Sequence, residues 1–229
     1  MAQIFHRGSN MIARLSIVGG VIFLCVLVVI LYEIALSPWY TNEHVTLQQP
    51  VPFSHRHHAG ELGIDCRYCH TDVEKSWYAG VPATQTCMTC HSQIWTNAAM
   101  LEPVRASYRT GVSLQWNKVN ELPEFVYFNH SIHVAKGIGC TTCHGPMATE
   151  TLTYKTGTLY MSWCLECHRD PGKYVRPESQ VFNPFYNPPS YGTPVKFEGV
   201  SYTNQKALGR ALVKKYQLRT YQYCSTCHR

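Results

Sequence analysis

The longest apolar segment of the chain runs without interruption from Leu15 to Leu36 and contains one charged residue, Glu33, near its end. A helix needs about 20 apolar residues to cross the hydrocarbon core of a bilayer. The pattern therefore predicts a transmembrane helix over residues 15–37. A cleaved signal peptide is the rival interpretation, but its apolar region is shorter, and Pro38 follows the only small-residue cleavage candidate.

The positive charges flanking this segment predict its orientation. Arg7 and Arg14 precede it, and no Lys or Arg follows before Arg56. The positive-inside rule then predicts a cytoplasmic N-terminus, residues 1–14, and a domain of residues 38–229 on the outer, periplasmic side of a bacterial inner membrane.

Beyond the apolar segment, periodic patterns are few. Residues 204–217 place Leu208, Leu212 and Tyr216 on one face at helical spacing, which predicts an amphipathic helix. A shorter helix is expected over residues 92–100, in the link between two halves of the domain. Residues 170–200 contain six prolines, a density that excludes a long helix or a central strand. Four aromatic residues of this Pro-rich arm favour its burial: Phe182, Phe185, Tyr186 and Tyr191.

Composition narrows the class of protein. The chain has 229 residues, of which 15% are charged and 12% aromatic, and these values exclude an intrinsically disordered protein. Its 11 cysteines and 12 histidines are too many for an ordinary cytosolic enzyme without a metal or cofactor. The formal charge of +6 comes from scattered Lys and Arg, which disfavours nucleic-acid binding.

All cysteines except Cys25 belong to five C-x-x-C-H motifs, the spacing that attaches c-type heme through two thioethers and supplies an axial histidine. Structural zinc pairs two C-x-x-C units per metal, and disulfides need no following histidine, so both alternatives are disfavoured. The sequence predicts five covalently bound heme c groups. Their expected attachment residues are Cys66, Cys69, Cys87, Cys90, Cys140, Cys143, Cys164, Cys167, Cys224 and Cys227, with proximal iron ligands His70, His91, His144, His168 and His228.

An internal repeat supplies candidates for the ligands on the other side of each iron. Modules 53–91 and 128–168 each read F-x-H-x-x-H, a short spacer, G-I-x-C-x-x-C-H and a further C-x-x-C-H. Histidines three apart in a helical turn point at different targets, so each can serve a different iron. The expected distal ligands are His55, His58, His130 and His133.

One heme then lacks a distal histidine. Methionine is the other common sixth ligand, and Met161 is the first candidate, followed by Met147. His57 breaks the repeat and is interpreted as non-ligating, although an exchange of roles with His58 stays open. His44 is a weak candidate. The fifth motif, in residues 204–229, must take its sixth ligand from earlier in the chain.

These observations predict a multiheme cytochrome c. One N-terminal transmembrane helix would carry a mostly irregular, sparsely α-helical periplasmic domain organised around five hemes. Six-coordinate irons have no open site for substrate, so we expect electron relay and no catalytic residues in this chain. Multiheme enzymes such as nitrite reductases keep one five-coordinate heme, and one open heme stays an alternative here.

Four segments resemble the pentaheme cytochrome c subunit of bacterial alternative complex III. They are residues 53–70, 79–91, 122–133 and 161–169, and with the apolar segment and the final motif the resemblance covers nearly the whole chain. The resemblance implies a subunit of a membrane-bound quinol:electron acceptor oxidoreductase. It implies as partners an iron–sulfur, molybdopterin-oxidoreductase-like subunit, polytopic quinol-binding subunits and a monoheme cytochrome. Electrons would pass towards a periplasmic cytochrome c, a blue copper protein or a terminal oxidase.

The alternative is a quinol dehydrogenase of the tetraheme-anchor type, which feeds a periplasmic reductase and also has one N-terminal helix. Five motifs and the duplicated F-x-H-x-x-H element count against it. A plain storage cytochrome is a third class, and it would not need the membrane helix.

Overall fold

The computed structural model describes residues 4–228 and divides into two units, which meet between Glu43 and His44. The first unit consists of the long helix α1, Ser9–Leu36, followed by the short helix α2, Pro38–Thr41. α1 is apolar along its length and none of its residues is buried. Its 28 residues make it long and apolar enough to cross a membrane. It begins earlier than the sequence predicted.

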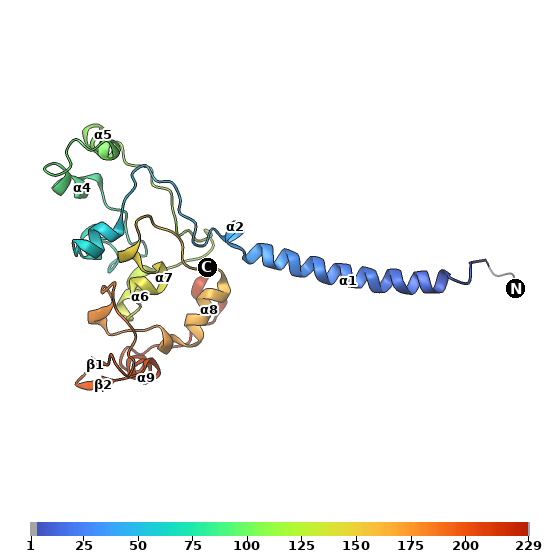
Figure 1. Ribbon diagram of the computed structural model, residues 1–229. Coiled ribbons are helices and arrows are strands. Elements are labelled where there is room, and N and C mark those ends of the chain that lie inside the picture. The colour runs from blue at the N-terminus through green and yellow to red at the C-terminus, as the bar shows by residue number, and fades with distance from the viewer. Residues whose placement is uncertain (1–3, 229) are drawn as a thin grey trace. The chain divides into compact units, whose positions relative to one another are not determined.

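The second unit, residues 44–228, contains short helices joined by long irregular segments, and its helical content is modest (Figure 1). Its α-helices are α3 (Cys66–Cys69), α4 (Thr84–His91), α5 (Glu102–Thr110), α6 (His130–Ala135), α7 (Cys140–His144), α8 (Met161–Arg169), α9 (Gln205–Lys215) and α10 (Cys224–Cys227). Turns of other helical types are η1 (Arg56–Glu61), η2 (Ala99–Leu101), η3 (Met147–Thr149), η4 (Pro171–Lys173) and η5 (Glu178–Gln180). The strands β1 (Val195–Phe197) and β2 (Val200–Tyr202) form an antiparallel hairpin.

The predicted helix at residues 204–217 is confirmed as α9. The side chain of Asn204 caps it by accepting a hydrogen bond from the Ala207 amide at 2.8 Å. Leu208 and Leu212 on its apolar face are fully buried, and with Val175 and Tyr216 they form one core cluster of the unit. α9 packs against η4 and lies beside the β1–β2 hairpin (Figure 1).

A second cluster forms around Val51, Leu101 and Val104, where α5 packs against α4. The expected helix over residues 92–100 is wrong. Turns occupy this stretch, and the helix comes later, as α5. Pro103 stands in the first turn of α5, where its missing N–H is tolerated.

The Pro-rich arm follows the expectation only in part. It contains no α-helix between residues 170 and 194, and the two turns η4 and η5 interrupt an extended chain. Phe182 and Tyr186 are half-buried. Phe185 and Tyr191 are exposed, so the expected burial of all four aromatic residues is wrong.

Candidate heme-binding sites

Each C-x-x-C-H motif forms a short helical segment. The five segments are α3, the end of α4, α7, the middle of α8 and α10. Residues three apart in a helix lie on the same face, so the two thiols of each motif point to one side. All cysteines are free thiols, as thioether attachment requires.

Thiols of different motifs lie close enough to influence one another. Cys66 and Cys140 form a hydrogen-bonded pair, which lowers the pKa of the Cys66 thiol to about 7 and raises that of Cys140. The pKa of Cys69 is raised by burial and by the neighbouring Cys87. The motifs at Cys66 and Cys87 are therefore neighbours, and the motif at Cys66 also adjoins the one at Cys140.

The remaining motifs continue the row. Burial, together with the nearby thiols Cys167 and Cys164, raises the pKa of Cys143 to about 12. Burial and Cys227 together raise the pKa of Cys164. The five motifs thus follow one another in space in the order 87, 66, 140, 164 and 224, named by their first cysteine.

The motif histidines share one hydrogen-bonding arrangement. In four of them Nδ1 faces a backbone carbonyl oxygen, which only accepts, so Nδ1 carries the proton and donates it. The acceptors are Gly80 O for His70 (2.6 Å), Ile94 O for His91 (3.3 Å), Tyr221 O for His168 (2.9 Å) and Phe125 O for His228 (3.0 Å). His144 is the exception, because the side-chain amide nitrogen of Asn120 donates a hydrogen bond to its Nδ1 at 3.1 Å. A neutral ring that donates from Nδ1 keeps the lone pair of Nε2 free for a metal.

The duplicated F-x-H-x-x-H element has the same geometry in both copies. Phe53 stacks on His58 at 4.4 Å between ring centroids, and its edge meets His55 at 4.9 Å. In the second copy the corresponding distances from Phe128 are 4.5 Å to His133 and 4.8 Å to His130. The phenylalanine therefore fixes the angle between the two histidines. The backbones differ, since the first copy winds as the π-helical turn η1 and the second as α6.

Hydrogen bonds orient these four rings as they do the motif histidines. Nδ1 of His58 donates to Ser54 O at 2.9 Å, and Nδ1 of His133 donates to the equivalent Asn129 O at 2.7 Å. Nδ1 of His130 donates to Trp77 O at 2.8 Å, and Nδ1 of His55 lies 3.0 Å from the Thr153 hydroxyl. Nε2 is again the nitrogen left for a metal.

Three of these histidines face a motif histidine. The ring centroids are 6.2 Å apart for His58 and His91, 6.3 Å for His130 and His144, and 6.2 Å for His133 and His168. Two metal–nitrogen bonds of about 2 Å in line separate two Nε2 atoms by about 4 Å, and each centroid lies roughly 1 Å behind its nitrogen. The observed distances fit one iron between the rings of each pair.

For the fourth histidine, His55, the pKa indicates that His70, the histidine of the remaining module motif, lies nearby. Burial and the neighbouring histidines together lower the pKa of His55 to about 4; burial has the largest effect, and His70 has the largest effect among the neighbouring charges. Burial also lowers the pKa of His144 to about 4, and it lowers the pKa of His133. These imidazoles are neutral at physiological pH, which is the protonation state that binds a metal.

The remaining candidate ligands have other surroundings. His57 bonds to Glu61 at 3.0 Å and stacks on Trp95. The ring of His44 packs against Tyr154 at 5.4 Å. Met161 begins α8 with an exposed side chain. Near the last motif, the ring of Phe125 stacks on His228 at 5.8 Å.

Sequence reasoning missed the groups that orient these histidines. The phenylalanine of F-x-H-x-x-H was visible as part of the repeat, and the structure gives it a role. The carbonyl acceptors carry no sequence signal, because any residue supplies a backbone oxygen. The contact of Arg176 with the third motif was also missed, because Arg176 lies 35 and 34 residues along the chain from the two threonines it contacts.

Comparison with known proteins points to the same chemistry. Residues 35–110, less than half of the chain, match the model of the class III cytochrome c family. The chain is 33% identical over 98 residues to the multiheme cytochrome c subunit of a menaquinone reductase from Nitratidesulfovibrio vulgaris. That alignment covers 42% of this chain and 46% of the relative, so the chain spans about half the length of the curated relative it matches. The chain is similar to multiheme cytochromes c, whose hemes are covalently bound.

Proposed function

We propose that this chain binds five heme c groups and relays electrons between them. Each motif supplies two thioether cysteines and a proximal histidine, from Cys66, Cys69 and His70 to Cys224, Cys227 and His228. The free thiols, the helical turn of every motif and the shared orientation of the motif histidines support this assignment. The similarity to multiheme cytochromes c agrees with it.

The facing ring pairs carry the assignment of distal ligands. His58 would share an iron with His91, His130 with His144, and His133 with His168. His55 would serve the iron of His70, the neighbouring charge with the largest effect on its pKa. The iron of His228 would take Met161, the first candidate from the sequence.

The hemes, when bound, supply one-electron redox chemistry. The motif cysteines would hold the hemes in a row, and the proximal and distal ligands would occupy both axial positions of each iron. The two histidines of each F-x-H-x-x-H turn face motifs that follow each other in space, so one rigid turn fixes the spacing of two neighbouring irons. The chain is therefore an electron-transfer subunit and not an enzyme on its own.

We place this row in a membrane-bound quinol:electron acceptor oxidoreductase of the alternative complex III type. The resemblance of residues 53–70, 79–91, 122–133 and 161–169 to its pentaheme subunit supports that complex. The relative named as a menaquinone reductase subunit supports a quinone-linked role. α1 would anchor the chain in the bacterial inner membrane with the heme domain on the periplasmic side. The partners would be the iron–sulfur subunit, the polytopic quinol-binding subunits and a monoheme cytochrome.

Purification of the complex from membranes in mild detergent tests this placement. Mass spectrometry of the co-purifying chains is expected to find the iron–sulfur and polytopic subunits. Recovery with a periplasmic reductase, or alone, would contradict it and favour the tetraheme-anchor type of quinol dehydrogenase. The variant Cys224→Ala with Cys227→Ala lacks the thiols of the last motif but keeps α1. Its co-purifying subunits therefore report on assembly of the complex separately from heme attachment at this motif.

A further inference from the structure

Arg176 is a buried cation at the third motif. It is 6% exposed and lies between η4 and η5. Its Nη2 donates hydrogen bonds to the hydroxyl groups of Thr141 at 3.0 Å and Thr142 at 3.1 Å, the two residues between the motif cysteines. Nη1 lies 3.5 Å from Asn183 O. The guanidinium therefore packs directly on the loop that attaches the third heme.

No carboxylate pairs with this charge among residues 4–228. Its Nε is buried without a hydrogen-bond partner in the same part of the chain. The ring of Tyr186 lies 4.6 Å from the guanidinium carbon and gives a cation–π contact. Burial lowers the pKa of Arg176, yet a guanidinium stays protonated in proteins. The positive charge is thus present, and no described carboxylate of the chain neutralises it.

The fold makes room for this side chain at a glycine. A Cβ atom on Gly139 would clash with the guanidinium of Arg176, so a larger residue directly before Cys140 would displace this group. The first module has Asp65 at the equivalent position, before Cys66. Asp65 pairs at 2.9 Å with Arg67, whose side chain is 48% exposed. The two copies therefore differ: a neutral, solvated ion pair stands at the first motif and a buried lone cation at the third.

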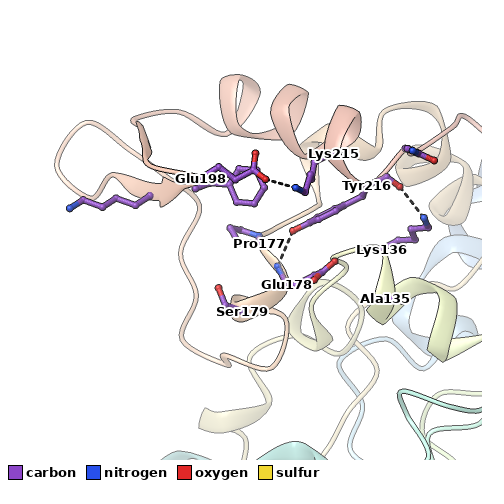
Figure 2. A pocket seen from close by; sticks show the side chains of 11 residues that line it. Ala135, Lys136, Pro177, Glu178, Ser179, Glu198, Lys215 and Tyr216 are labelled. Carbon is purple, nitrogen blue, oxygen red and sulfur yellow. Dashed lines mark hydrogen bonds and ion pairs between the residues drawn. The ribbon is translucent and has the colours of Figure 1, made fainter.

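The backbone around Arg176 is held on both sides. Its amide donates to Gly137 O at 2.9 Å, and the amide of Glu178 donates to the Tyr216 hydroxyl at 3.0 Å. Lys136 donates to Tyr216 O at 2.9 Å, so Tyr216 ties both segments to the end of α9 (Figure 2). These hydrogen bonds fix the backbone from which the Arg176 side chain extends towards the third motif.

We propose that Arg176 raises the reduction potential of the heme attached at Cys140 and Cys143 above that of the equivalent heme at Cys66 and Cys69. This inference rests on the proposed function. Reduction of an iron removes one positive charge from the site, and a nearby buried cation favours the state with less positive charge. Interaction with a buried charge is screened less by salt than interaction with an exposed one. Arg176 would make the central motif of the row the preferred place for an electron.

Spectroelectrochemical titration of the purified complex tests the proposal. Arg176→Gln is expected to move one component of the heme titration to lower potential and leave the others in place. Arg176→Lys keeps the charge and is expected to retain the wild-type curve. The matched control is Asp65→Asn combined with Arg67→Gln, which removes a neutral pair and is expected to move no component.

An Arg176→Gln protein with full heme content and an unshifted curve would overturn the proposal. If that variant fails to incorporate heme, Asn183→Asp decides. It adds a carboxylate to the residue whose backbone oxygen lies 3.5 Å from Nη1 of Arg176, and it keeps an acceptor for the Phe185 amide. The same component moving to lower potential supports the proposal, and an unshifted curve overturns it. A wild-type heme count below five would overturn the proposed function instead.

Discussion

Replacing His133 by alanine removes the ring that faces His168 at 6.2 Å, so the iron between them would lose one axial ligand. A five-coordinate ferrous heme binds carbon monoxide, whereas an iron with two histidine ligands does not. The structure gives His133 one facing motif histidine, so the expected increase is one carbon monoxide per chain. The lost Nδ1 hydrogen bond to Asn129 contributes only about 1 kcal/mol to stability, so the variant is expected to fold.

The assay is a carbon monoxide titration of the dithionite-reduced complex, followed by the Soret band and compared with wild type. His130→Ala is expected to give the same increase, and the double variant twice that increase. His57→Ala is the matched control, because His57 pairs with Glu61 and faces no motif histidine. An unchanged stoichiometry in His133→Ala, or an increase in His57→Ala, would refute the assignment of distal ligands.

Three further predictions concern stability and anchoring. Leu212→Ala empties a fully buried site in the α9 core and is expected to cost about 2–5 kcal/mol; an unchanged thermal midpoint by circular dichroism would contradict this packing. Burial raises the pKa of Glu150, so the associated stability is present below the ordinary pKa and lost as pH rises through the raised one. Glu150→Gln is therefore expected to raise the thermal midpoint at about pH 7 and not at about pH 4, and a gain at both pH values would argue against it. In cells without the partner subunits, replacing α1 by a cleavable export signal is expected to release the heme domain from the membrane fraction, and retention there would mean that another segment anchors the chain.

The elements that sequence predicted well depend on short-range patterns. The apolar segment is apolar on all sides, and the helix at residues 204–217 has one apolar face. Both features can be recognised from the spacing of hydrophobic residues in the sequence. The helix expected at residues 92–100 failed because its polar and apolar residues show no such spacing. The structure instead begins α5 at Glu102, next to the proline that favours a helix start.

For the candidate sites, spacing identified the cysteines and histidines but not their partners. Which distal histidine faces which motif depends on contacts between modules, such as His130 of the second copy donating to Trp77 O of the first. Arg176 meets the third motif through chain folding that no local pattern encodes. Its only local sign is Gly139, where the first copy has Asp65.

The central claim is that one chain carries five covalently bound hemes. Intact-mass spectrometry of the denatured polypeptide, combined with an alkaline pyridine hemochrome measurement on the same sample, tests it directly. The account predicts a mass increase of five hemes per chain and an iron content to match. Fewer than five, or zinc in place of iron, would contradict it.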